Sequence, residues 1–447
     1  MLAEGPNLAG LLEKIRSRDA VIGIVGLGYV GLPLALAAAK KGFRVVGFDI
    51  NSGCVVELNA GKTPLKHIPA DEIKAAIRAR LFEATDEFSR LSEPDAIIVC
   101  VPTPLGQHRE PDLTFVEGTM EAIAKALRPG QLISLESTTY PGTTSKICRP
   151  ILEKSGLRSV RDFYLAYSPE REDPGNLDFT THSIPKVVGA DGPEALRLAL
   201  ALYGSIADRV VPVSSLETAE AVKISENVFR AVNIALVNEL KMVYFRMGVD
   251  IFEVIEAAKT KPFGFMPFYP GPGLGGHCIP IDPFYLSWKA RAYGVNTKFI
   301  ELAGEINADM PRWVIDRIAN VLNGRTRKSL SCARILIVGV AYKKNIGDVR
   351  ESPALTIMQL LKERGAEVEF HDPHVLAIPP TRDHSRLAGL RSIHLTPSII
   401  AAYDIAVIIA DHDNVDWHML VKSAPAIVDT RNVLKRLGFE EEKIVIA

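Results

Sequence analysis

The sequence predicts an α/β protein in which two Rossmann-like, doubly wound domains are joined by a long central helix. Apolar strand-like runs alternate with helical segments twice along the chain, and the first series opens with a glycine-rich turn behind a strand. Between the two series lies a helical segment that runs to about Met247. Such alternation is typical of parallel sheets that helices cover on both faces.

Length and composition suit a globular protein of several domains. The 447 residues exceed what one core accommodates, and we expect domains over residues 1–213, 214–324 and 325–447. A formal net charge of −1 argues against nucleic acid or a membrane surface as partner. The five cysteines are widely spaced without a C-x-x-C pair, so we expect no disulfide framework, no metal site and a cytoplasmic location.

The first strand and turn carry the pattern of a dinucleotide-binding site. The apolar run 21–25 leads into Gly26-x-Gly28-x-x-Gly31, which opens a helix, and the next strand ends at Asp49. In such a turn, backbone N–H groups bind a pyrophosphate, and the acid accepts the ribose hydroxyls and repels a 2′-phosphate. We therefore expect NAD as the cofactor. The alternative is an α/β unit with tight turns and no nucleotide.

Polar turns follow three of the predicted strands. The series continues with strand-like runs at residues 96–101, 132–135, 163–167, 186–188 and 209–213. The first three runs end in turns that contain Thr103, Thr138 and the pair Glu170 and Arg171. Ligands of doubly wound sheets lie beyond the carboxyl ends of the strands, so these side chains should line one crevice. The alternative for the last turn is a solvated charged loop.

The central helix combines a largely apolar circumference with one polar stripe. It opens at Ser214-Ser-Leu-Glu217, which has the pattern of a capping box. Glu220, Lys223, Asn227 and Arg230 then recur every three or four residues, which places them on one face. Lysine is rarely buried without a partner, so Lys223 and Asn227 are candidate site residues. The alternative is an ion pair on an exposed edge of the helix.

Residues 271–283 concentrate glycine and proline around Cys278. Glycines let another group approach the main chain closely, and the cysteine would be presented into that space. A helix follows, with Asp282 as N-cap and Pro283 at its first position, and a helix N-terminus lowers the pKa of a nearby thiol. The alternative is a turn that ends in a buried, inert cysteine. Two further helices are expected at residues 299–308 and 311–323.

A second α/β series follows a basic joint at residues 324–329. It comprises strand-like runs at 334–339, 367–371, 405–410 and 426–429, with a helix at 353–364. Its first turn offers Lys343 and Lys344, and later Arg350, where the first series offers glycines. We expect these charges to hold a different anion, a nucleotide phosphate. The alternative is a pair of solvated loop lysines.

Motifs along nearly the whole chain resemble those of the UDP-glucose/GDP-mannose dehydrogenase family. In chain order they are Gly26-x-Gly28-x-x-Gly31, the Thr103 turn, Glu136-Ser-Thr138, Ser168-Pro-Glu170, Lys223-x-x-x-Asn227, Gly275-Gly-His277-Cys278-x-x-x-Asp282 and Lys343-Lys-x-x-Gly-Asp-x-Arg350-Glu-Ser. The resemblance implies a homodimer or higher oligomer formed through the long helix. It also implies that the carbon 6 alcohol of a UDP-sugar is oxidised to a carboxylate with two NAD⁺.

The same resemblance implies roles for single residues. Cys278 would form a thiohemiacetal and then a thioester, while Lys223 and Asn227 would stabilise the oxyanion. Glu170 would assist proton transfer; Thr138 and Asp282 would hold the hydrolytic water, with an N-cap as the alternative role of Asp282. The implied cofactor positions are Gly26, Gly28, Gly31, Asp49, Thr103, Thr138 and Arg350, and the implied substrate positions are Glu170, Arg171, Lys223, Asn227, Gly275, Gly276 and Lys343.

Two departures bear on the substrate. UDP-glucose enzymes of the family usually have serine in place of His277 and an aromatic residue in place of Arg171; this chain is similar to the branch that acts on UDP-N-acetylhexosamines. Residues 261–270 resemble those of the members that act on UDP-N-acetylglucosamine, with UDP-N-acetylmannosamine as the alternative substrate. The resemblance implies that the product, UDP-N-acetylglucosaminuronate, is used for surface polysaccharide. Two other functions are kept as alternatives. One is a two-electron 3-hydroxyacid dehydrogenase, which would need no thiol. The other is a binding protein that responds to NAD and a nucleotide sugar without catalysis, and its binding would not change in Cys278→Ser.

Overall fold

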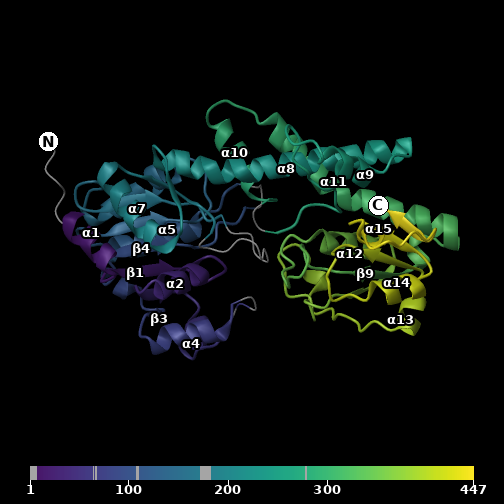
Figure 1. Cartoon of the computed structure of the whole chain (residues 1–447), viewed down its shortest axis with the longest axis horizontal. Coiled ribbons are helices and arrows are strands. Elements are labelled where there is room, and N and C mark those ends of the chain that lie inside the picture. The colour runs from purple at the N-terminus through teal and green to yellow at the C-terminus, as the bar shows by residue number, and fades with distance from the viewer. Residues whose placement is uncertain (1–7, 64, 66–67, 107–109, 172–182, 277–278) are drawn as a thin grey trace. The chain divides into compact units, whose positions relative to one another are not determined.

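The computed structural model describes residues 8–63, 65, 68–106, 110–171, 183–276 and 279–447. They form two compact units, the first comprising Met1–Glu226 with Trp288–Tyr293 and the second Asn227–Ser287 with Gly294–Ala447. In Figure 1 the first unit runs from purple to teal and the second ends in yellow. The division into three domains that the sequence suggests stays a prediction.

An eight-stranded sheet organises the first unit. In sheet order its strands are β3 (Phe82–Thr85), β2 (Arg44–Phe48), β1 (Val21–Val25), β4 (Ala96–Val99), β5 (Leu132–Leu135), β6 (Tyr164–Tyr167), β7 (Lys186–Ala190) and β8 (Val210–Pro212). β1 pairs in parallel with both β2 and β4, with Ile22 opposite Val45 and Ala96. The strand order reverses between β1 and β4, where nucleotide sites of open α/β sheets lie.

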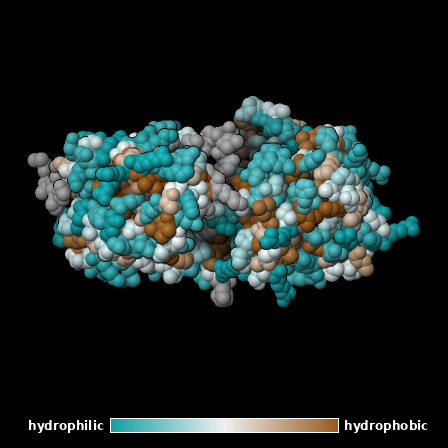
Figure 2. Space-filling view, turned by 90° about the horizontal axis from the view of Figure 1, so that it is seen from below, coloured by the Kyte–Doolittle hydropathy of each residue, from teal (hydrophilic) through white to brown (hydrophobic). Residues whose placement is uncertain are grey.

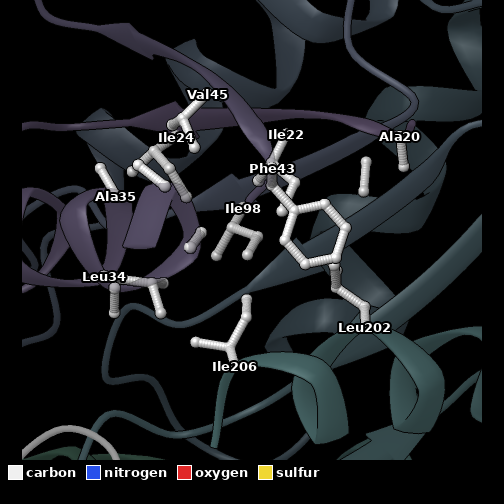
Figure 3. Close-up of a cluster of buried hydrophobic side chains, with 14 of the residues drawn as sticks. Ala20, Ile22, Ile24, Leu34, Ala35, Phe43, Val45, Ile98, Leu202 and Ile206 are labelled. Carbon is white, nitrogen blue, oxygen red and sulfur yellow. The ribbon is translucent and has the colours of Figure 1, made fainter. Parts of the chain in front are cut away.

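Alternate residues of these strands enter two apolar cores, one on each face of the sheet. The helices of this unit are α1 (Leu8–Ser17), α2 (Gly31–Lys40), α3 (Ser52–Asn59), α4 (Ala70–Arg78), α5 (Thr114–Ala126), α6 (Arg149–Leu152) and α7 (Pro193–Ile206). On one face of the sheet, Ile22, Ile24 and Ile98 pack with helices α2 and α7 (Figure 3). On the other, Ile97 and Val99 pack with α5. Burial on both faces explains why the strands are almost wholly apolar.

The last two strands correct the expectation of a wholly parallel sheet. β7 pairs antiparallel with β6, and β8 pairs parallel with β7, so both run against the first six strands. A parallel neighbour needs a long crossover connection, whereas an antiparallel one does not. The apolar pattern of a strand is the same in both cases, so it predicted the strands but not their direction.

One continuous helix, α8 (Leu216–Met247), begins in the first unit and ends in the second, as the sequence predicted. Its start differs from the expected capping box by one residue. The hydroxyl of Ser215, and not that of Ser214, accepts the N–H of Thr218 at 3.1 Å. The boundary between the units lies between Glu226 and Asn227 of this helix. Lys223 belongs to the first unit and Asn227 to the second, one helical turn apart.

A five-stranded, wholly parallel sheet organises the second unit and confirms the second doubly wound domain. Its strands, in sheet order, are β10 (Glu367–His371), β9 (Arg334–Val338), β11 (Ile405–Ile408), β12 (Ile427–Asp429) and β13 (Ile444–Ile446). Ile335 and Ile337 face one apolar core, and Leu336 and Val338 face the other. The helices of this unit are α9 (Ile251–Ala258), α11 (Lys298–Val321), α12 (Pro353–Glu363), α13 (Pro397–Ala401), α14 (Trp417–Ser423) and α15 (Val433–Arg436). Helix α10 (Asp282–Arg291) begins in this unit and ends in the first.

Helix α11 is a single helix where the sequence predicted two. Pro311 lies inside it and cannot donate an N–H to the carbonyl four residues earlier. Met310, Pro311 and Val314 are nevertheless buried. Packing of this apolar face therefore stabilises a continuous helix across the proline.

The surface is mixed rather than uniformly polar. The face in Figure 2 is mostly hydrophilic, with separate hydrophobic patches. Among the described residues, no helix is both long and apolar enough to cross a membrane. Phe229, Leu236 and Val243 of α8, spaced seven residues apart, are each about half exposed, so the described residues cover this apolar stripe of the helix only in part.

Candidate active site

The turn after β1 is shaped by its glycines and by Asp49. Gly26 has φ +91°, and its N–H donates to the carbonyl of Phe48 at 2.8 Å. A Cβ at Gly31 would lie 1.8 Å from the carbonyl oxygen of Gly26, so this position excludes every side chain. The Asp49 carboxylate accepts the N–H of Leu27 at 2.9 Å, which ties the acid at the end of β2 to the turn.

Among the described residues, none requires a glycine at position 28. A Cβ built there would meet no atom within 4 Å. The missing side chain leaves the backbone before α2 open where a pyrophosphate would approach it. Asp49 is partly exposed and has lone pairs beyond those that its backbone contacts use, so it can accept ribose hydroxyls. These residues therefore fit NAD.

Thr103 and Thr138 follow the neighbouring strands β4 and β5 at the same edge of the sheet. Thr103 is buried and Thr138 partly buried. The hydroxyl of Ser137 donates to the carbonyl of Val101 at 2.7 Å, which joins the two turns. The turns thus lie together as expected, while cofactor contacts of the two threonines stay a prediction.

Lys223 is buried, and the turn after β6 holds its ammonium group. Nζ donates to the backbone oxygen of Glu170 at 2.5 Å and lies 3.2 Å from its Oε2. The two side chains are only 4% and 12% exposed, so each charge compensates the other where water is scarce. The polar stripe is therefore not an exposed surface pair at Lys223.

Arg171 makes contacts that its sequence position did not suggest. Its guanidinium pairs with Glu226 of α8 through Nη2 at 2.6 Å and Nε at 3.3 Å. Nη1 donates to the carbonyl of Pro185 at 2.6 Å. These contacts fasten the Glu170 turn to α8, whereas the expected contact of Arg171 with substrate stays a prediction.

In the second unit, Asn227 orients Asp282. The amide Nδ2 donates to Asp282 Oδ2 at 2.5 Å, and Arg230 Nη2 donates to the amide oxygen at 2.6 Å. Asn227 and Asp282 are both 1% exposed, and Asp282 is the first residue of α10. The aspartate therefore starts a helix and also contacts the stripe of α8. Cys278 and His277 lie outside the described residues, and the role of Cys278 stays a prediction.

The glycine segment before Cys278 packs on the turns of the second sheet. A Cβ at Gly275 would lie 2.5 Å from the Cβ of Tyr342. Gly276 has φ +83°, and its N–H donates to the carbonyl of Arg350 at 3.0 Å. Contact within the protein thus gives these glycines a reason that the sequence interpretation, which reserved the space for ligands, did not include.

Asn238, which sequence reasoning missed, also holds this segment. Its Oδ1 accepts the N–H of Gly271 at 3.0 Å, and its Nδ2 donates to Asn307 of α11 at 2.9 Å. A signal was available, because Asn238 lies eleven residues after Asn227. That spacing is three helical turns, which extends the polar stripe of α8.

Glu220, noted on the stripe without a role, fastens the turn after β5 to α8. Its carboxylate accepts the N–H of Gly142 at 2.5 Å and both the N–H and the hydroxyl of Thr144, at 2.8 and 2.7 Å. Burial raises the pKa of Glu220 to about 7, against the lowering effect of these hydrogen bonds. The turn that carries Thr138 is thereby tied to the helix that carries Lys223.

The three basic residues that the sequence singled out in the second unit, Lys343, Lys344 and Arg350, lie in the turn after β9 or shortly after it. Lys343 is partly buried in this turn. Lys344 pairs with Asp413 at 2.6 Å, and Arg350 pairs with Asp348 at 2.6 Å. The structure thus places Lys343 and Arg350 in one unit, apart in sequence from the turn of Gly26, and their ligand contacts stay predictions.

Comparison with known proteins agrees with this arrangement. All three domains that define the UDP-glucose/GDP-mannose dehydrogenase family match the chain. They are the NAD binding domain over residues 20–207, the central domain over 217–309 and the UDP binding domain over 336–436. UDP-N-acetyl-D-glucosamine 6-dehydrogenase of Pseudomonas aeruginosa is 41% identical over 362 residues, which cover 80% of this chain and 84% of that enzyme.

A second relative matches over a longer stretch. UDP-N-acetyl-D-mannosamine dehydrogenase of Pyrococcus horikoshii is 35% identical over 94% of this chain and 97% of its own length. A solved structure of the UDP-D-ManNAc dehydrogenase from that organism superposes with a TM-score of 0.85, at 33% identity, and covers 95% of this chain and 98% of that one. The chain therefore belongs to the UDP-glucose/GDP-mannose dehydrogenase family and is an NAD-dependent nucleotide-sugar dehydrogenase.

Proposed function

We propose that the enzyme oxidises carbon 6 of UDP-N-acetylglucosamine to give UDP-N-acetylglucosaminuronate, with two NAD⁺ reduced per sugar. The pairing along α8 carries the proposal. Lys223 is held by Glu170, and Asn227 is held by Asp282, which follows Cys278 by four residues. An ammonium and an amide one turn apart suit an oxyanion, and a carboxylate beside each suits proton transfer.

The chain's residues supply all the chemistry except hydride acceptance, which NAD supplies when the Gly26 turn and Asp49 hold it. The positive charge of Lys223 favours loss of the proton from the alcohol. Loss of that proton together with a hydride from carbon 6 leaves an aldehyde. The Cys278 thiolate then adds to the aldehyde, and Lys223 and Asn227 stabilise the resulting oxyanion. After the second oxidation a thioester remains, which a water held by Thr138 and Asp282 hydrolyses with help from Glu170.

The choice of sugar is supported by the relative from Pseudomonas aeruginosa and by His277 and Arg171 in the sequence. UDP-N-acetylmannosamine is the second candidate, because the relative named for it matches 94% of the chain against 80%. Either acid would serve the synthesis of surface polysaccharide. We place the enzyme in the cytoplasm as a homodimer or higher oligomer.

A panel of UDP-sugars, with NADH absorbance and product acid counted together, tests the proposal. We expect UDP-N-acetylglucosamine to give the highest kcat/KM and two NADH for each acid. A clear preference for the mannosamine epimer would replace our substrate. One NADH per product would exclude the thioester route. Cys278→Ser should abolish acid formation, and an unchanged yield of acid would contradict the role of the thiol.

A further inference from the structure

The turn after β9 repeats the backbone scaffold of a dinucleotide-binding turn. Gly339, at φ +83°, donates its N–H to the carbonyl of His371 at 2.8 Å. Val340 donates its N–H to Asp372 Oδ2 at 2.7 Å. In the first unit, the same two bonds join the first glycine and its neighbour to β2 and to Asp49. Asp372 thus stands where the ribose-binding acid of a dinucleotide site stands.

The side chain of His412 contacts the carboxylate of Asp372. The ring is fully buried; its Nε2 lies 3.1 Å from Asp372 Oδ2, and its Nδ1 faces the N–H of Asn345 at 2.9 Å. Because Nδ1 accepts that N–H, the ring proton lies on Nε2 and is donated to the carboxylate. Further N–H groups reach Asp372 from Ala341, His374 and Val375. At 1% exposure, Asp372 offers almost no surface to a ribose, whereas Asp49 is partly exposed.

The two contacts of His412 hold both ends of the turn that carries Lys343. Nε2 contacts Asp372, which accepts the N–H of Val340 at the start of the turn, and Nδ1 accepts the N–H of Asn345 at its end. The side chain of Asn345 adds two bonds to Asp413: Nδ2 donates to the carboxylate at 2.6 Å, and Oδ1 accepts the backbone N–H at 2.9 Å. Asn345 has φ +60°, a conformation that asparagine adopts more readily than most residues. Both ends of the turn are therefore fixed to the segment after β11.

We propose that His412 is a positioning residue for the nucleoside diphosphate of the substrate. It holds the turn of Lys343 in the conformation that binds the phosphates. It also hydrogen-bonds to Asp372, the carboxylate that the ribose of a dinucleotide would need. This inference rests on the proposed function, because it takes the second sheet as the UDP site. A unit with the scaffold of an NAD site is thereby kept for a different nucleotide.

Substitutions at His412 separate its two contacts. Glutamine keeps a donor near the position of Nε2 but loses the acceptor for Asn345, whereas asparagine keeps an acceptor near Nδ1 but does not reach Asp372. We expect His412→Ala to weaken UDP binding to the full chain about tenfold, with the other two variants in between. NAD binding and kcat should change little, and KM for the UDP-sugar should rise. His418→Ala is the matched control, because His418 is an exposed histidine of the same unit whose ring meets that of Phe439 edge-on.

Calorimetry with UDP and with NAD as separate probes decides between the outcomes. A wild type that does not bind UDP would remove the proposed function itself. Wild-type UDP affinity in His412→Ala would overturn the positioning role while leaving the function intact. Equal losses of UDP and NAD affinity, with a lower unfolding temperature, would overturn it as well. If the alanine variant does not fold, unchanged UDP affinity in both the glutamine and the asparagine variants contradicts the role.

Discussion

Gly28 and Gly31 predict opposite consequences for one added methyl group. Gly31→Ala forces a Cβ against the carbonyl of Gly26 and should destabilise the fold by about 1–3 kcal/mol. Gly28→Ala meets open space, so the unfolding temperature should stay near that of the wild type while NAD affinity falls about tenfold. Thermal unfolding with and without NAD measures both effects. Unchanged NAD affinity in Gly28→Ala would remove the pyrophosphate from this position.

Burial of Glu220 predicts a pH dependence of stability. Its pKa is raised to about 7 in the folded protein, whereas an unfolded glutamate has a pKa of about 4.3. The folded state therefore binds a proton that the unfolded chain releases, so the stabilisation is full below the unfolded pKa and is lost as the pH rises to about 7. Between pH 5 and pH 8, the free energy of unfolding of the wild type should fall relative to Glu220→Gln by roughly 1–3 kcal/mol. An equal difference at both pH values would contradict this assignment.

Asp282 can be tested for catalysis apart from structure. Asp282→Asn keeps an oxygen that can accept the amide of Asn227, but it loses the negative charge. We expect kcat to fall at least about 100-fold, with an unfolding temperature close to that of the wild type. Asp250→Asn is the matched control, because Asp250 caps the start of α9 outside the site. A full turnover rate in Asp282→Asn would leave only the helix start as its role.

At the scale of elements, the sequence predicted what depends on local pattern and missed what depends on distant partners. The strands and turns up to Asp49 follow from apolar runs and glycine chemistry. Lys223 could be selected because a lysine on a buried helix needs a partner, but that this partner is Glu170, 53 residues away, could not be predicted. The antiparallel direction of β7 and the continuous helix across Pro311 are likewise set by packing between elements.

The buried pair of Glu136 and Lys186 joins β5 to β7 across β6. Lys186 Nζ lies 2.5 Å from Glu136 Oε2, and the side chains are 11% and 1% exposed. Lys186→Met would leave the glutamate charge buried without its partner, so we expect a loss of about 3–5 kcal/mol in urea unfolding. The double variant Lys186→Met/Glu136→Gln should recover most of this loss. If the double variant is as unstable as the single one, the pair does not explain the loss.

At the scale of the whole molecule, the exposed stripe of α8 predicts self-association. Phe229, Leu236 and Val243 are 50%, 51% and 46% exposed, and their spacing of seven residues places them on one face of the helix. A second copy of the chain would cover this face, in keeping with the dimer that the family resemblance implies. In sedimentation velocity we expect the wild type to be a dimer or larger and Leu236→Glu to shift it toward monomer, because a charge in such an interface lacks a partner. Leu437→Glu, at 54% exposure outside α8, should leave the assembly unchanged. A monomeric wild type would contradict the prediction, as would a Leu236→Glu variant that assembles normally.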